Sequence, residues 1–137
     1  MDTDQEIPLV EYQALAEFRY QLRRFLHFSE QAARAVGLEP QQHQLLLALK
    51  GLPEGRLPTV GELAERLQIQ HHSTVELVNR MVDRNLIERT RDEGDQRKVL
   101  ISLTPYGEEV LRKLSLLHRT ELRSTGPALV RALDALL

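Results

Sequence analysis

The sequence contains no cysteine, and this absence excludes a disulfide framework, a thiolate metal site and a thiol-based oxidant sensor. Long apolar runs are missing too, because no segment approaches the roughly 18 consecutive apolar residues that a membrane-spanning helix requires. The first residues, M-D-T-D-Q-E, are acidic where a secretory signal would be basic. We therefore expect a cytoplasmic protein that has no membrane partner.

The size of the chain, 137 residues with 42% hydrophobic content, suits one domain (residues 1–137) with its own core. The net charge of -2 is unevenly distributed, since residues 1–18 hold five acids and no base. Residues 19–137 carry 18 Lys and Arg against 15 Asp and Glu, which is a net charge of +3. This balance permits a polyanionic partner without identifying one.

Residues 11–36 contain no proline or glycine, and small or apolar side chains recur there every three or four positions, which predicts a long amphipathic helix. The positions of this seam are Leu15, Phe18, Leu22, Phe25, Ser29, Ala32 and Val36. Tyr12, Tyr20 and Phe28 lie off the seam and give the helix a second apolar face. That face suggests a subunit partner, and packing within the same chain is the open alternative.

The next segments predict three helices in close succession. Gly37 ends the first helix, and Pro40 opens a second that runs to the helix-breaking residues 51–58. Thr59 and Glu62 have the spacing of a capping box, which starts a short third helix that ends near residue 67 or 68. After a tight turn, apolar residues again fall on one helical face at Val75, Val78, Met81 and Val82. Two short helices joined in this way form a helix-turn-helix.

A β-hairpin follows directly. Asn85 tolerates the left-handed conformation that ends a helix, and the β-prone segments 86–91 and 98–103 flank the turn D-E-G-D-Q-R. Thr104 and Pro105 then start a helix that we expect to end at S-T-G-P, residues 124–127, before a separate last helix. The predicted fold is mostly α (α+β): a winged helix-turn-helix (residues 40–104, wing about 86–103) between terminal helices (residues 11–36 and 105–137).

A winged helix places its second helix in the DNA major groove and its hairpin near the backbone or minor groove. Helical spacing puts Thr74, Val78 and Met81 on the buried face, and puts polar residues opposite, at His72, Ser73, Glu76, Asn79, Arg80 and Asp83. Thr74 belongs to the same helical segment, and we include it among the predicted DNA contacts. The predicted DNA-binding set is His72, Ser73, Thr74, Glu76, Asn79, Arg80, Arg91, Asp95, Arg97 and Lys98.

The hairpin tip contains an acid and a base that can form a contact with each other. Asp95 stands two residues before Arg97 and can hold the guanidinium extended through a charge-assisted contact. The arginine then loses less conformational entropy when it enters a narrow minor groove.

Together, L-A-E-R-L-Q-I, H-H-S-T-V-E-L-V-N-R-M and N-L-I-E-R-T-R-D-E-G-D-Q-R-K-V-L-I-S-L-T-P-Y-G resemble the MarR family of dimeric winged-helix transcription regulators. The typical signature is an Asp-x-Arg wing followed by Leu-Thr-x-x-Gly, matched here at Asp95, Arg97, Leu103, Thr104 and Gly107. The resemblance spans essentially the whole chain. It implies a homodimer built from the terminal helices, with residues 70–80 as recognition helix on a pseudo-palindromic double-stranded operator.

The resemblance also implies a repressor that responds to a small aromatic acid or phenol, bound between the dimerisation helices and the DNA-binding lobe. Candidate lining residues, by location, are Tyr12, Tyr20, Arg24, Phe28 and His43. Two residues depart from the family pattern. Asn85 stands where many members have glycine, and Glu76 would repel phosphates but could accept from a cytosine amino group.

Other functions are weighed against this one. His71 and His72 are adjacent, so on a helix they point about 100° apart and cannot grip one ion, and the remaining histidines are scattered. We therefore predict no metal site and no cofactor. No Ser-His-Asp order, carboxylate pair, phosphate loop or dinucleotide fingerprint supports an enzyme. A winged helix that binds only proteins is the open alternative, and the salt dependence of DNA binding separates the two.

The histidine pair leaves one question of geometry. Ser73 and Glu76 can form a capping box, so the recognition helix could begin at Ser73 and leave both histidines in the turn. Near the positive end of the helix, His72 can donate to a phosphate or a guanine edge. We predict that His72→Ala weakens operator binding more than His43→Ala does.

Overall fold

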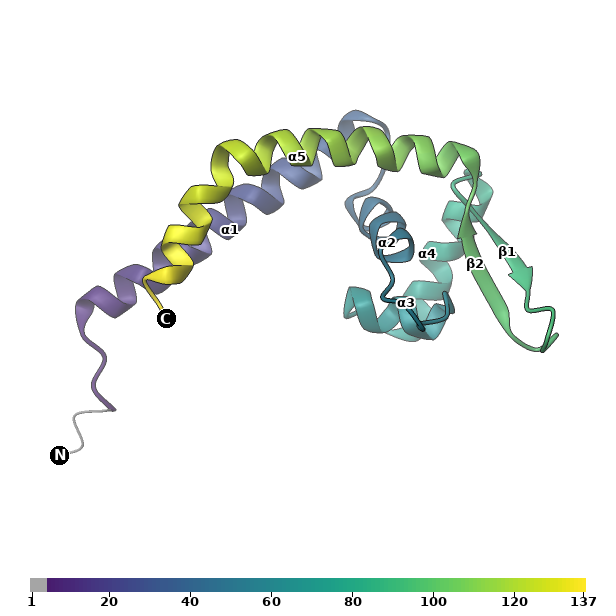
Figure 1. Ribbon diagram of the computed structural model, residues 1–137, viewed down its shortest axis with the longest axis horizontal. Coiled ribbons are helices and arrows are strands. Elements are labelled where there is room, and N and C mark those ends of the chain that lie inside the picture. Colours follow the sequence, from purple (N-terminus) through teal and green to yellow (C-terminus); the bar gives the residue numbers. More distant parts are fainter. Residues whose placement is uncertain (1–4) are drawn as a thin grey trace.

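The computed structural model describes residues 5–137, which form an elongated arm and a lobe beneath one end of it (Figure 1). The arm consists of α1 (Leu9–Ala35) and α5 (Pro105–Asp134), which lie side by side. The lobe consists of α2 (Pro40–Lys50), α3 (Val60–Leu67), α4 (His71–Asp83) and the antiparallel hairpin β1 (Ile87–Arg91) and β2 (Val99–Leu103). The predicted fold class, a mostly helical winged helix between terminal helices, is confirmed.

The hydrophobic core lies in the lobe and includes the first half of α5. Its fully buried large side chains come from every element of the lobe: Leu45, Leu46, Leu63, Leu77, Val78, Met81, Leu86, Ile87 and Ile101. Leu114 adds α5 to this core. Each such side chain contributes about 1.5–3 kcal/mol through burial, so the core fixes the orientation of α4 and the hairpin relative to the arm.

The junction between arm and lobe is short. Gly37 has φ +81°, and the N–H groups of Gly37 and Leu38 donate to the carbonyls of Arg34 and Ala33, which closes α1 as predicted. Pro40 is the first residue of α2, also as predicted, while Glu39 and Gln42 form a capping box that was not foreseen. A few residues therefore separate the arm from the first helix of the lobe.

The expected break at residues 124–127 is wrong, because α5 continues through Pro127 to Asp134 as one helix. Proline lacks an N–H and its ring crowds the carbonyl four residues earlier, which bends a helix without always ending it. The helix turns along its last third in Figure 1. Ala132, beyond the proline, is buried, and Leu129 faces α1 across a cleft, so packing against α1 carries the helix past the proline.

Much of the arm is apolar and exposed. Residues at both helices of the arm keep large solvent-accessible fractions, including Leu9 (70%), Val10 (68%), Tyr12, Leu15, Tyr20, Leu26, Leu117, Val130 and Leu133. The predicted seam of α1 is buried at Ser29 and Ala32 only, toward the lobe end. No helix within residues 5–137 is long and apolar enough to span a membrane.

Candidate nucleic-acid interface

The helix-turn-helix begins at a side-chain cap. The Thr59 hydroxyl accepts from the main-chain N–H of Glu62 at 3.2 Å, as the capping-box spacing predicts. The Glu62 carboxylate binds Arg66 (3.2 Å). Gln68 ends α3 in the left-handed conformation (φ 56°), and α4 starts after only two more residues. This tight connection fixes the crossing of α3 and α4.

Helix α4, the predicted recognition helix, starts at His71, with Gln70 as its N-cap. Both histidines therefore lie in the first helical turn, and the alternative start at Ser73 is wrong. The main-chain N–H of Thr74 donates to the Gln70 carbonyl at 3.0 Å, which is the first helical bond after the turn. His71 and His72 are exposed at the N-terminal end of α4, where main-chain N–H groups favour an anion.

The outward face of α4 agrees with helical spacing. His72, Glu76, Asn79, Arg80 and Asp83 are exposed, and Ser73 is half-buried. The prediction that Thr74 contacts DNA is wrong. Its side chain is fully buried, and its hydroxyl donates to the carbonyl of Gln70 at 2.9 Å, so it stabilises the first turn instead.

Two of the expected DNA contacts already have partners within the chain. The amide oxygen of Asn79 accepts from Arg89 of β1. The guanidinium of Arg80 donates to the Glu39 carboxylate, which lies at the N-terminus of α2, at 3.2 Å. These contacts were missed because the partners are 10 and 41 residues away in sequence, and only the packing of the lobe brings them together.

The wing holds Arg97 in the predicted manner. The Asp95 carboxylate accepts from the main-chain N–H of Arg97 (3.0 Å) and from its Nε (3.3 Å). These main-chain and side-chain hydrogen bonds from Arg97 lower the pKa of Asp95. The Arg97 side chain is 92% exposed, so the tethered guanidinium projects into solvent, and Lys98 is exposed beside it. Arg91, another predicted contact, donates to the main-chain carbonyl of Gln96 at 2.8 Å.

The Leu-Thr-x-x-Gly segment connects the wing to the arm. The Thr104 hydroxyl accepts from the N–H of Gly107 (3.0 Å) and donates to the carbonyl of Asn85 (2.6 Å). Asn85 itself has φ 60°, the left-handed conformation expected at the end of α4. One side chain thus caps α5 and binds the residue that follows the recognition helix.

The model of the MarR family matches residues 36–98, which cover α2, α3, α4 and most of the wing. The winged helix of this chain is therefore similar to that of the MarR family. The match contains the helix-turn-helix and the Asp95 and Arg97 pair of the wing.

Two curated relatives are similar to parts of this chain. An HTH-type transcriptional regulator of Bacillus subtilis, YsmB, is 29% identical over 104 residues, which is 73% of this chain and 69% of the relative. The HTH-type transcriptional repressor MdtR of the same species is 37% identical over 79 residues, or 55% of this chain and 49% of MdtR. The similarity to MdtR therefore covers about half of each protein.

Solved MarR family structures share the fold. AbsC of Streptomyces coelicolor superposes with a TM-score of 0.73 at 24% identity, over 88% of this chain and 81% of AbsC. A variant of MepR from S. aureus, solved bound to an oligodeoxyribonucleotide, has a TM-score of 0.67 at 20% identity, over 96% and 100% of the two chains. At these identities the likeness shows the winged-helix fold with its terminal helices.

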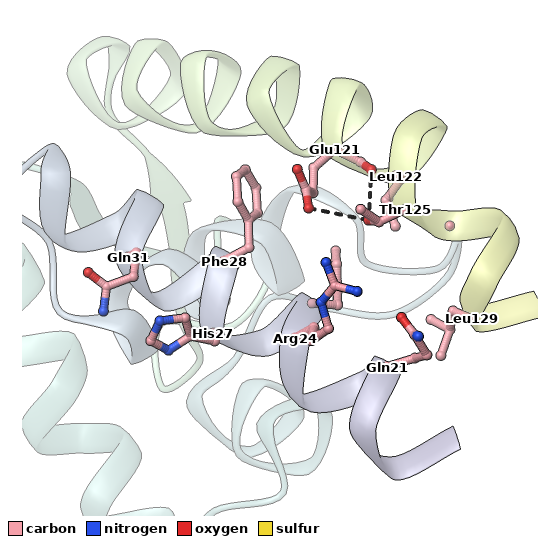
Figure 2. A pocket seen from close by; sticks show the side chains of 11 residues that line it. Gln21, Arg24, His27, Phe28, Gln31, Glu121, Leu122, Thr125 and Leu129 are labelled. Carbon is pink, nitrogen blue, oxygen red and sulfur yellow. Dashed lines mark hydrogen bonds between the residues drawn. The ribbon is translucent and has the colours of Figure 1, made fainter. Parts of the chain in front are cut away.

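A cleft of about 320 Å³ lies between α1 and α5 (Figure 2). Of the five predicted ligand residues, Arg24 and Phe28 line it. Tyr12 and Tyr20 are more than half exposed outside it, and the Arg24 guanidinium stacks 5.7 Å from the centre of the Tyr20 ring. This cleft is therefore bounded by the two arm helices. The effector site was expected elsewhere, between the arm and the lobe.

The residues of the cleft that the sequence did not indicate are mostly polar. Figure 2 shows Gln21, His27 and Gln31 on α1, with Glu121 and Thr125 opposite on α5. The Thr125 hydroxyl donates to the Glu121 carbonyl at 2.9 Å. Leu129 reaches the cleft because the helix is continuous through Gly126 and Pro127, which the sequence pattern did not predict.

His43, the fifth predicted ligand residue, is only 2% exposed and lies where α1, α2 and α5 meet. Its ring centre is 5.0 Å from that of His118, whose Nδ1 donates to the Leu114 carbonyl at 2.7 Å and whose Nε2 is hydrogen-bonded to the hydroxyl of Ser29 at 2.9 Å. Burial, and secondarily the charge of His118, lowers the pKa of His43 to about 4. His43 is therefore neutral near pH 7 and belongs to the packing of the junction.

Within residues 5–137, no group of three or more His, Asp or Glu side chains is arranged to hold a metal ion.

Proposed function

We propose that the protein binds double-stranded DNA sequence-specifically as a homodimer in the cytoplasm and represses transcription until a small aromatic effector binds. The observation that carries the DNA-binding proposal is the Asp95-tethered, 92% exposed Arg97 at the tip of the wing. The wing tip and the N-terminal end of α4 both project from the side of the lobe that faces away from the arm (Figure 1). One duplex can therefore meet both.

The proposed contacts follow from this arrangement. His72 and Ser73, in the first turn of α4, donate to base edges or phosphates, and Glu76 accepts from a cytosine amino group. Arg97 enters the minor groove beside the operator half-site, and Arg91 and Lys98 meet the backbone. The MepR structure with an oligodeoxyribonucleotide and the name of the repressor MdtR support DNA binding and repression.

The homodimer is supported by the exposed apolar surface of the arm, since Leu9, Val10, Tyr12 and Val130 are each more than half exposed. A second copy packed against this surface would cover it. A two-fold axis through the arm would present two recognition helices to a pseudo-palindromic operator, whose half-sites lie about one helical turn apart.

The effector proposal rests on the cleft between α1 and α5. Arg24 offers a planar guanidinium that matches a carboxylate, and Phe25 and Phe28 offer apolar ring faces. An aromatic acid bound there would contact both arm helices and shift their packing.

Selection of duplexes from a random-sequence pool, followed by fluorescence anisotropy in increasing salt, tests DNA binding. We expect dimers by light scattering, a selected pseudo-palindrome, and an affinity that falls steeply with salt because phosphate contacts release counterions. No selected duplex, or affinity independent of salt, would favour the alternative of a winged helix that binds only proteins.

Benzoate and phenol are the probes for the effector. We expect benzoate to raise Tm and to release the selected duplex from the wild-type protein, but not from Arg24→Ala or Phe28→Ala. Arg34→Ala, exposed on α1 and outside the cleft, is the matched control and should retain the response. A response that persists unchanged without Arg24 and Phe28 would exclude this cleft.

A further inference from the structure

Two arginines at the C-terminal end of α4 donate to side chains of α2, although both remain partly exposed to solvent. Arg80 donates to the Glu39 carboxylate through Nε (3.4 Å) and a terminal nitrogen (3.2 Å). Arg84, the C-cap residue that follows α4, donates to the side-chain oxygen of Gln42 at 3.0 Å. Both acceptors belong to the first turn of α2, so the C-terminal half of α4 is bound to the beginning of α2 by side chains.

The acceptors also belong to the junction between arm and lobe. Glu39 and Gln42 form the capping box of α2, and the Gln42 oxygen that accepts from Arg84 also accepts from the main-chain N–H of Glu39 at 3.0 Å. Glu39 follows α1 after only the closing turn at Gly37 and Leu38. A movement of the C-terminal end of α1 therefore reaches α4 through this first turn of α2.

The position of Arg80 argues against a direct role on DNA. Winged helices read base edges mainly with the N-terminal residues of the recognition helix, and Arg80 lies nine residues after its start at His71. Its guanidinium is already directed at Glu39, on the neighbouring helix. The pair is about half exposed, at 49% and 53%, and such pairs contribute little to folding stability. Its loss would change geometry more than stability.

We propose that Glu39 and Gln42, through Arg80 and Arg84, are positioning residues that set the angle between the recognition helix and the arm, and hence the half-site spacing that the dimer accepts. This inference rests on the proposed DNA-binding function and deepens it. In the dimer each recognition helix is presented from its own arm, so a change in that angle alters the distance between the two helices.

Charge reversal tests the proposal. Glu39→Arg and Arg80→Glu each place like charges together, whereas the double reversal restores an opposite pair. The probes are the duplex selected by the wild-type protein and derivatives with one base pair inserted or removed at its centre. We expect each single reversal to weaken binding to the selected duplex by roughly 3- to 10-fold and to change the preferred spacing, and the double reversal to recover both.

Glu109→Gln is the matched control, because Glu109 forms an ion pair of similar exposure with Arg112 inside α5. We expect it to leave spacing preference unchanged, and Tm values to show that all variants are folded. If Arg80→Glu weakens binding equally at every spacing and the double reversal recovers nothing, Arg80 contacts DNA and the proposal is overturned. Single reversals without effect overturn it too. A wild-type protein that selects no duplex would refute the proposed function itself.

Discussion

The main-chain carbonyl of Leu86 occupies the space in which a side chain on Gly107 would lie. The first turn of α5 consequently rests directly on the residue that precedes the wing, and Thr104 completes the contact through its bond to Asn85. The glycine of the Leu-Thr-x-x-Gly segment is thus required by a close approach of two main chains, and not by its own dihedral angles.

Gly107→Ala should therefore destabilise the protein by about 2 kcal/mol or more, because the new methyl group forces α5 away from Leu86. Gly61→Ala is the control, since its methyl group in the first turn of α3 would meet the Thr59 hydroxyl at an ordinary 3.9 Å. It should stabilise the protein by up to about 1 kcal/mol. Urea unfolding at one protein concentration measures both, and equal effects would contradict the close approach.

Arg97→Ala should weaken binding to the selected duplex and lower the slope of log affinity against log salt by about 1, because one phosphate-side contact is lost. Tm should not change, because the side chain is 92% exposed. Asp95→Asn should weaken binding less, since the guanidinium remains but its tether is weaker. Glu93→Gln, also exposed in the wing, serves as the control. Anisotropy in a salt series gives the affinity and the salt slope of the wild-type protein and the three variants, and thermal unfolding gives their Tm values.

His72→Ala should weaken DNA binding more than His43→Ala when both are compared as folded protein. His72 lies exposed in the first turn of α4, whereas His43 is buried at the junction and its loss acts on stability. His27→Ala, an exposed histidine of α1, is a cleaner control. Anisotropy below saturation, with Tm measured in parallel, distinguishes the cases. Equal losses for His72→Ala and His27→Ala would remove His72 from the interface.

Stability should fall as the pH is lowered from about 6.5 toward 4. The pKa of His43 is lowered to about 4 in the folded protein by burial and then by His118, so in this range the unfolded chain binds a proton that the folded chain excludes. The stabilisation is complete above the unfolded pKa and is lost as the pH falls through the folded one. Urea unfolding from pH 7.5 to 4.5 measures it.

His43→Gln, which cannot titrate, is the comparison for this pH series. Its stability should depend less steeply on pH than that of the wild-type protein between pH 6.5 and 4, whatever its absolute value. Parallel curves for the two proteins would show that other groups, and not His43, cause the acid sensitivity.

Local chemistry made most of the fold predictable from the sequence. Thr59, Gly37 and Asn85 each sit where a helix must start or end, and each has the expected conformation or cap. The contact between Asp95 and Arg97 was predictable because the partners are two positions apart and a turn brings them together. The spacing of residues close together in the sequence was therefore enough to predict the helix-turn-helix and the wing.

Long-range packing determined what the sequence did not reveal. Pro127 is a strong local reason to end a helix, and contacts with α1 override it. Arg80 looks like a DNA contact on a helical wheel, and only the folded lobe brings Glu39 to it. The cleft beside Arg24 and Phe28 likewise depends on the path of α5 beyond the proline.

The unbroken length of α1 has a mechanical consequence. With 27 residues and a rise of about 1.5 Å per residue, the helix is a lever arm about 40 Å long whose last turn carries the lobe. A tilt of about 5° at its far end displaces the lobe by about 3.5 Å, close to the rise of one base pair along DNA. Sub-ångström changes in the packing of the arm are thereby magnified to the scale on which an operator is read.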